Sequence, residues 1–124
     1  MRALEQIVEE NNRGCLNSYN KFLQLDKNKS RVLYASMPKA YVSSDFDGIA
    51  ALSVSDDGVF RYIYNPVYVS DPLSNGEESG HYLSLALNPS MRARALRAEK
   101  GSEEFVMLMA REEYIARLLA LVYL

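Results

Sequence analysis

The chain has 124 residues and a net charge of −2, so it is long enough for one domain and has no general attraction to nucleic acid. Hydrophobic residues make up 48% of the sequence and charged residues 24%, a balance that argues against intrinsic disorder. The one cysteine excludes an intramolecular disulfide, and no apolar run reaches the about 20 residues of a membrane-spanning helix. We therefore expect a single domain over residues 1–124, in a small cytoplasmic protein of phage or bacterial type that binds no membrane.

The first helix is predicted over residues 2–25, because apolar residues recur there at steps of three and four. Gly14 interrupts the pattern and predicts a break or kink, since glycine destabilises a helix interior by about 1 kcal/mol relative to alanine. The polar residues 26–30 that come next predict a turn.

The middle of the chain is rich in β-branched and aromatic residues, which predicts a series of short strands. We expect these strands at residues 31–36, 40–44, 48–55, 59–65, 66–70 and 81–87. Between the last two, residues 71–80 contain one proline, two glycines and three acids, and this composition predicts a loop.

The strands before and after Gly58 form the strongest local signal, a predicted hairpin around Asp-Asp-Gly. A two-residue turn would place Val54 opposite Arg61 and would pair aromatic residues with small polar ones. A three-residue loop, with Gly58 at positive φ, instead pairs Val54 with Phe60 and leaves Ser53 and Arg61 on the outside. The same register pairs Leu52 with Tyr62 and Ala50 with Tyr64. We favour this second register, because it makes one face of the hairpin uniformly apolar.

Two helices are predicted to close the chain. Asn88 is suited to cap a helix that has Pro89 at its first position, so one helix should cover residues 89–99 and stop at Gly101. Ser102 should cap the last helix. Together these elements predict an α+β fold with an N-terminal helix, an antiparallel sheet of four to six strands, and two C-terminal helices packed on one face.

The last nine residues, 116–124, contain one charged side chain and end the final helix on a wide apolar arc. Two interpretations remain open: the arc belongs to the core of this domain, or it forms a seam with a second chain. The residues predicted to mediate self-association are Tyr114, Leu118, Leu121 and Val122.

Two further groups of residues are candidates for binding a partner protein. Arg92, Arg94 and Arg97 lie on the predicted 89–99 helix and could bind an acidic partner or an anion, although a solvated amphipathic helix explains them too. The second group, the tyrosine-rich strand region, contains Tyr62, Tyr64 and Tyr68. Core packing is the alternative for these tyrosines, and the acidic segment around them argues against a nucleic-acid surface.

No catalytic, cofactor or metal signature is present in the sequence. His81 comes shortly after Glu77 and Glu78 and could form a pair for general acid–base chemistry, but a histidine at the start of a strand is more often a surface residue. Cys15 would need His81 close by to act as a nucleophile, and a buried hydrophobic role explains it better. We therefore expect no enzyme, no catalytic residue, no cofactor and no bound metal.

The function predicted from these features is a non-enzymatic protein-interaction module that acts stoichiometrically as an inhibitor, adaptor or chaperone and self-associates as a homodimer or larger homo-oligomer. The partner would be a protein. One alternative is a binder of a phosphate-bearing ligand, either a nucleotide or a nucleic acid, through the Arg92–Lys100 helix, and another is a structural component of a larger particle. A small hydrolase or transferase that uses His81 is the third.

Overall fold

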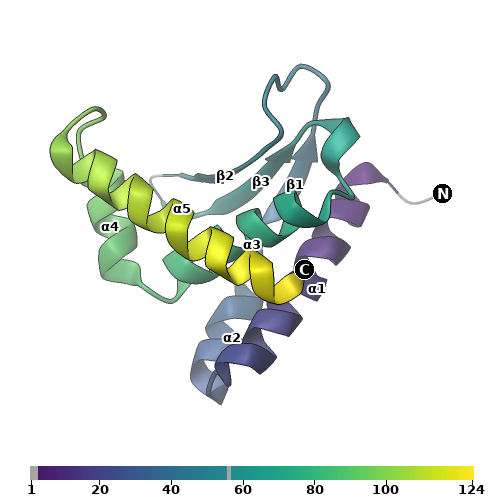
Figure 1. Cartoon of the computed structure of the whole chain (residues 1–124), viewed down its shortest axis with the longest axis horizontal. Helices are drawn as coiled ribbons and strands as arrows, with labels where there is room; N and C mark the ends of the chain where they lie inside the picture. The colour runs from purple at the N-terminus through teal and green to yellow at the C-terminus, as the bar shows by residue number, and fades with distance from the viewer. Residues whose placement is uncertain (1–2, 56) are drawn as a thin grey trace.

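The computed structural model describes residues 3–55 and 57–124 (Figure 1). In these ranges the chain forms helices at both ends of its length and a small sheet between them. The elements are α1 (Leu4–Leu23), α2 (Lys27–Ala35), β1 (Lys39–Val42), β2 (Ala50–Val54), β3 (Phe60–Tyr64), the 3-10 helix η1 (Pro66–Tyr68), α3 (Pro72–Ala86), α4 (Pro89–Arg97) and α5 (Glu103–Tyr123).

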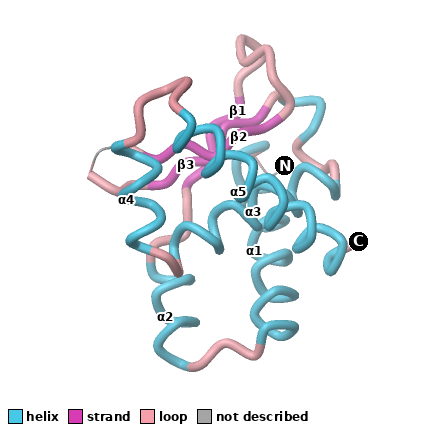
Figure 2. The backbone as a smooth tube through the Cα atoms, turned by 60° about the vertical axis from the view of Figure 1, so that its left-hand side comes forward, coloured by secondary structure: helices cyan, strands magenta, loops and turns pink. Residues whose placement is uncertain are grey.

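The sheet has three strands in the order β1-β3-β2, gathered at one end of the molecule (Figure 2). β2 pairs with β3 in antiparallel fashion, whereas β1 pairs with β3 in parallel. The α+β class is therefore correct, but the predicted antiparallel sheet of four to six strands is wrong. Three of the six predicted strands are helical in the structure, and one of the two strand pairs is parallel.

The hairpin between β2 and β3 has the register that the sequence favoured. Val54 pairs with Phe60, and Gly58 has a φ of 84° in the connecting loop. Ser53 and Arg61 are exposed on the outer face of the sheet, where the Arg61 guanidinium lies 5.8 Å from the centre of the Tyr41 ring. The inner face carries the buried residues of β3, which are Phe60, Tyr62 and Tyr64.

The predicted strand at residues 31–36 is wrong, because these residues belong to α2. Asp26 caps this helix by accepting a hydrogen bond from the Lys29 amide at 2.9 Å, so the predicted polar turn is the start of a helix. Two side-chain bonds hold α2 against α1, and one of them joins Tyr34 Oη to Asn17 Oδ1 at 2.6 Å. The β-type composition of this segment is overridden by the cap and by these contacts.

The predicted loop at 71–80 and the predicted strand at 81–87 are also wrong, because one helix, α3, covers residues 72–86. Asp71 caps α3 by accepting from the Ser74 amide at 3.2 Å, and Pro72 occupies the first turn, where its missing amide hydrogen costs nothing. Gly76 and Gly80 lie four positions apart and share one face of the helix. These glycines allow α5 to pack closely against α3. Because this contact involves residues far away in the chain, the local sequence does not predict a helix here.

The segment after β3 is a short 3-10 helix, and the strand predicted at 66–70 is therefore wrong as well. The Asn65 side chain caps it by accepting from the Val67 amide at 3.1 Å, and Pro66 stands in its first turn.

The predicted helices at the two ends of the chain are confirmed. α1 is continuous through Gly14, so the predicted break does not occur. α4 begins at Pro89, and α5 is capped by Ser102, whose hydroxyl accepts from the Phe105 amide at 3.1 Å. Among the described residues, no helix combines the length and apolarity needed to cross a membrane.

The helices are arranged around α3, which lies against α1, α5 and β2 (Figures 1 and 2). The expected cover of the sheet by both C-terminal helices is wrong: α1 packs on β1 and α3 packs on β2, while α5 lies mainly against α3. The tyrosines whose side chains are fully buried in the core are Tyr19, Tyr62, Tyr64 and Tyr82.

Candidate functional site

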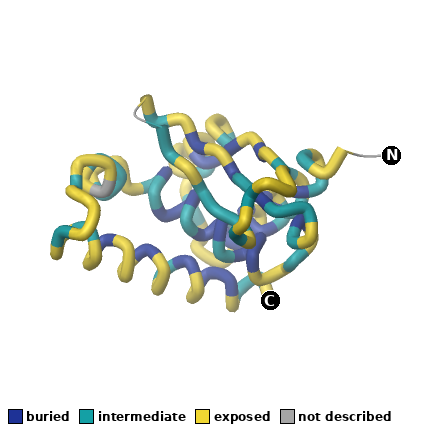
Figure 3. Tube along the Cα trace, turned by 90° about the horizontal axis from the view of Figure 1, so that it is seen from above, coloured by how far each residue is buried: buried dark blue, intermediate teal, exposed yellow. Residues whose placement is uncertain are grey.

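The outer face of α5 carries a line of exposed apolar side chains. Tyr114 is 67% exposed, Leu118 48% and Leu121 68%, and helical spacing aligns them on one side of the helix. The exposed residues Met107 and Ala110 extend the same line toward the start of α5. We call these five residues the α5 stripe. Figure 3 shows α5 along one edge of the molecule, with its buried residues turned inward and its exposed residues outward.

The opposite face of α5 belongs to the core. Leu108, Ala116, Leu119 and Ala120 are buried there, and Val122 is half-buried against the same cluster. The tail of the chain is therefore both core and surface. Three of the four residues predicted for self-association are exposed, and Val122 packs on the core instead.

Small residues bring α5 very close to α3. A Cβ atom added at Gly76 would lie 3.0 Å from the Ala120 Cβ, and one added at Gly80 would lie 3.0 Å from the Ala116 Cα. The Gly76 carbonyl also accepts a hydrogen bond from Tyr19 Oη at 2.7 Å, which links the pair to α1. This close contact fixes the rotation of α5 about its axis, and so it fixes which side chains point outward.

The tyrosines predicted for partner binding lie mostly in the core. Tyr62 and Tyr64 are 0% exposed, and the Tyr64 hydroxyl donates to Asn75 Oδ1 at 2.7 Å. Tyr68 is half-buried in η1. In this structure Tyr62 and Tyr64 offer no surface to a partner, and both pack in the core. The buried Tyr62 hydroxyl has no hydrogen-bond partner among the described residues.

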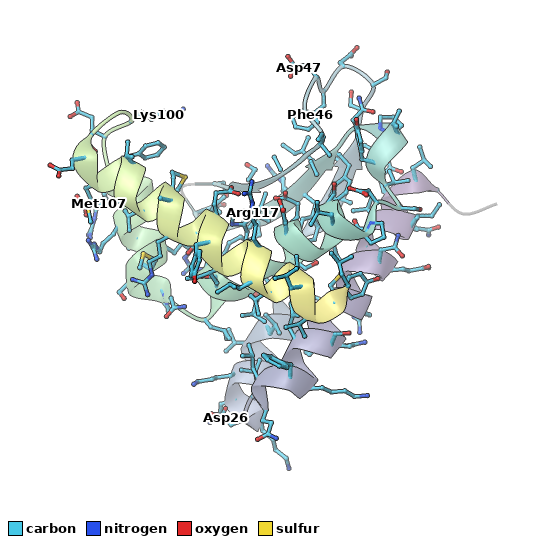
Figure 4. All side chains as sticks on the ribbon, in the orientation of Figure 1. Asp26, Phe46, Asp47, Lys100, Met107 and Arg117 are labelled. Carbon is cyan, nitrogen blue, oxygen red and sulfur yellow. The ribbon has the colours of Figure 1, made fainter. Side chains whose placement is uncertain are left out.

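The arginines predicted for partner binding do not converge on one point. The Arg92 guanidinium lies 5.6 Å from the centre of the Phe60 ring, while Arg94 Nε lies 3.2 Å from Glu104 Oε1. Arg97 is exposed near the end of α4, and Lys100 lies in the turn before α5 at the edge of the molecule farthest from α1 (Figure 4). Arg94 is thus already paired with a carboxylate. It lines a cavity of about 520 Å³ together with Arg111, Glu103 and Glu104, and the lining of this cavity does not include Arg92, Arg97 or Lys100.

His81 lies inside a group of carboxylates that the sequence did not reveal. On α3 it stands between two acids of α5, with Nδ1 3.6 Å from Glu112 Oε2 and Nε2 3.3 Å from Glu113 Oε1. Glu112 Oε1 accepts a hydrogen bond from Ser84 Oγ at 2.9 Å. The sequence associated His81 with Glu77 and Glu78 as chain neighbours, but only the packing of α3 on α5 brings Glu112 and Glu113 to the imidazole.

Glu78 is the buried acid that lies beside this pair on α3. It is 9% exposed, and no hydrogen bond or ion pair within the described residues reaches its carboxylate. Burial raises the pKa of Glu78 to about 7, and the nearby charges of Glu113 and Glu77 raise it while that of His81 opposes the rise.

The charge of His81 is stabilised by the same group. Burial lowers the pKa of His81, but the contact with Glu112 and the charges of Glu78 and Glu113 raise it, and the net result is a raised pKa. Glu112 Oε2 is fully buried and accepts no hydrogen bond in the described structure. Three carboxylates, those of Glu78, Glu112 and Glu113, therefore surround the one imidazole of His81.

A cavity of about 260 Å³ opens beside these side chains, between β2, α3 and α5. Its lining residues are Ala50, Ala51, Leu52, Glu78, His81, Leu85, Met109, Glu112 and Glu113. We call it the acidic cavity. Its lining combines apolar side chains from all three elements with carboxylates from α3 and α5, so the cavity can hold a positively charged group beside a short hydrocarbon chain.

Cys15 is remote from this chemistry. Its side chain is fully buried, and burial raises the pKa of the thiol to about 11, which keeps it protonated at neutral pH. Within residues 3–55 and 57–124, no three His, Cys, Asp or Glu side chains are arranged to hold a metal ion.

The chain matches no protein-family model, no curated protein and no solved structure.

Proposed function

We propose that this protein is a non-enzymatic interaction module that acts stoichiometrically through a protein surface and self-associates through the α5 stripe. The observation that carries the proposal is the stripe itself: a line of exposed apolar side chains on a helix whose other face is locked against α3. Contiguous apolar surface of this kind marks interaction sites on proteins. The module would serve as an inhibitor, adaptor or chaperone for a partner protein.

The proposed first occupant of the stripe is a second copy of the chain. An antiparallel α5 pair with its two-fold axis at Tyr114 would place Leu118 against Ala110 of the second copy and Leu121 against Met107 of the second copy. Large side chains then meet small or flexible ones, as helix packing favours. The 21 residues of α5 give a contact line of about 30 Å.

We place the protein in the cytoplasm, because its free and buried Cys15 fits a reducing compartment.

A phosphate-binding function has weaker support than self-association, because Arg94 is engaged with Glu104 and Arg92 lies over Phe60. A structural role in a larger particle would use the same α5 stripe, and it would appear as a higher oligomer.

The test is the mass of the particle in solution, measured by light scattering after gel filtration at micromolar concentration. We expect the natural chain to run as a dimer and the Leu118→Lys/Leu121→Lys variant to run as a folded monomer, because buried unpaired lysines oppose the seam. Val67→Lys is the matched control, since Val67 is 81% exposed but lies on η1, away from the stripe. A natural chain that stays monomeric would overturn self-association. A double variant that remains dimeric would show that the dimer interface does not lie on the α5 stripe.

A further inference from the structure

The acidic cavity has two features that self-association through α5 does not explain. Glu78 is 9% exposed as a residue and lines the cavity, and no hydrogen bond or ion pair from the described residues reaches its carboxylate. Glu112, which lines the cavity from α5, has a fully buried Oε2 that accepts no hydrogen bond within the described residues. Buried carboxylates are stabilised by donors or by a positive charge. Among the described residues, Glu112 Oε2 has the His81 imidazole at 3.6 Å, whereas Glu78 has neither a hydrogen bond nor an ion pair.

The charges around the cavity leave room for one further cation. His81 is the one cationic side chain among the lining residues, and it already contacts both Glu112 and Glu113. Arg117 lies outside the lining, with its Nε 3.7 Å from Glu77 Oε1 and 4.0 Å from Glu113 Oε2, and 71% of its side chain is exposed. It therefore balances the outer acids, and among the lining residues the positive charge that acts on Glu78 is that of His81.

The shape and lining of the cavity indicate the class of cation. Its volume of about 260 Å³ lies below the roughly 300–1,000 Å³ of pockets that hold drug-sized ligands, so the ligand is small. Ala50, Leu52, Leu85 and Met109 provide apolar surface beside the carboxylates, which suits a hydrocarbon chain better than a bare ion. An ammonium group has three donors, and these can reach separate carboxylate oxygens at once.

We infer that the acidic cavity binds a primary alkylammonium group, with the nitrogen between Glu78 and Glu112 and the alkyl chain against Leu85 and Met109. The group comes either from a free small amine or from the lysine side chain of a bound protein. Both sources present the same chemistry to the cavity, and they differ only in the atoms attached to the far end of the alkyl chain.

The first experiment measures binding of n-butylamine to the full chain by calorimetry and by amide NMR at about pH 8, where the Glu78 carboxyl is mostly ionised and the amine still charged. We expect binding that shifts the amide signals of Leu85 and Met109, and we expect n-butanol, which has no charge, to bind about tenfold or more weakly. Absence of butylamine binding up to millimolar concentration, or equal binding of butanol, would overturn the inference.

Two variants test the site directly. Glu78→Gln keeps the shape of the side chain and removes its charge, and it should weaken butylamine binding about tenfold or more. Met109→Lys places an ammonium of the chain's own at the cavity, at a position that is 38% exposed and tolerant of a polar residue, and it should block butylamine. Glu99→Gln, an exposed acid beyond α4, is the matched control and should bind as the natural chain does. Undiminished binding in both site variants would overturn the inference.

The two sources are distinguished with a lysine whose α-amino and α-carboxyl groups are both converted to amides, so that only its side-chain ammonium is charged. Its binding is compared with that of butylamine. Tighter binding than butylamine indicates that the cavity takes a lysine of a partner protein, whereas weaker binding indicates a free amine. Both comparisons are made relative to the measured binding of butylamine, so either result supports the ammonium site.

Discussion

Glu78 combines deep burial with a carboxylate that has no hydrogen-bond partner in the described structure, and its charged form is therefore disfavoured in the folded chain. His81, three residues further along α3, shows the opposite behaviour, because the surrounding carboxylates favour its charged form. Both residues hold protons in the folded state that they would lose more easily in the unfolded state. At the residue scale, the stability of this protein is thus tied to pH.

We predict that the free energy of unfolding falls as the pH rises from about 5 to about 8. Glu78 has an ordinary pKa of 4.5 and a folded-state pKa of about 7, so between these values the folded chain binds a proton that the unfolded chain has lost. His81 acts in the same direction: its stabilising effect is complete below its ordinary pKa of 6.5 and is lost as the pH rises through the raised folded-state pKa. Glu78 alone contributes roughly 3 kcal/mol as an upper bound.

Urea unfolding of the natural chain and of Glu78→Gln at several pH values would measure this dependence. Glu78→Gln should be the more stable protein at about pH 8 and should show a flatter pH profile, while Glu99→Gln keeps the natural slope. Stability that rises between about pH 5 and pH 8 in the natural chain would contradict the assignment.

At the scale of elements, the decisive contact is that between α3 and α5, where Gly76 and Gly80 face Ala120 and Ala116. This contact brings the two helices together with almost no side chain between them. It also places Glu112 and Glu113 against His81, and it turns the α5 stripe toward solvent. Both candidate surfaces of the protein therefore depend on two glycines of α3.

We predict opposite effects for two Gly→Ala substitutions in helices. Gly80→Ala should destabilise the fold by about 1–3 kcal/mol, because the added methyl group would lie 3.0 Å from the Ala116 Cα and 3.2 Å from its carbonyl oxygen. Gly14→Ala should stabilise it by about 0.5–1 kcal/mol, because Gly14 lies inside α1 with no described atom within 4 Å of the new methyl group. Thermal or urea unfolding gives both values. If Gly80→Ala were also stabilising, the close α3–α5 contact would be refuted.

At the scale of the whole molecule, α5 joins the core to the surface. Leu119 and Ala120 are buried against the rest of the fold, while Leu118 and Leu121 point outward from the same helical turns. Changes that remove the helix end and changes that alter only its outer face should therefore have different consequences.

We predict that truncation after Ala116 destabilises the protein by at least the about 2–5 kcal/mol typical of losing one buried leucine, because Leu119 and the half-buried Val122 and Tyr123 leave the core. Leu118→Lys/Leu121→Lys should lose only the stability that dimerisation adds, since both side chains are at least 48% exposed and leave the core intact. Urea unfolding followed by circular dichroism compares the two. A truncated chain that unfolds like the full one would show that the end of α5 contributes no core.

Much of the fold was predictable from local signals. α1, α4 and α5 carry apolar periodicity or caps such as Ser102, and the β2–β3 hairpin has Gly58 at a loop position with positive φ. The register of that hairpin followed from the requirement that one face be apolar. These are short-range effects, in which each residue acts on neighbours along the chain or directly across a turn.

The errors arose where a local signal had two meanings. Asp71 and Pro72 fit a turn as well as the start of a helix, and the two glycines of α3 resemble loop residues until α5 is packed against them. The parallel pairing of β1 with β3 joins strands with β2 between them in the chain, and nothing in either strand by itself predicts it.

By itself, the sequence determined the α+β class, the hairpin with its register, and the helices at the two ends, because these depend on backbone propensity and on the period of apolar residues. Only the tertiary structure decided which side of α5 is core, why Tyr62 and Tyr64 are buried, and that His81 meets Glu112 and Glu113. The physical reason is distance along the chain. A contact between residues about thirty positions apart depends on how two helices rotate against each other, and in this protein Gly76 and Gly80 set that rotation through the room they leave for Ala116 and Ala120.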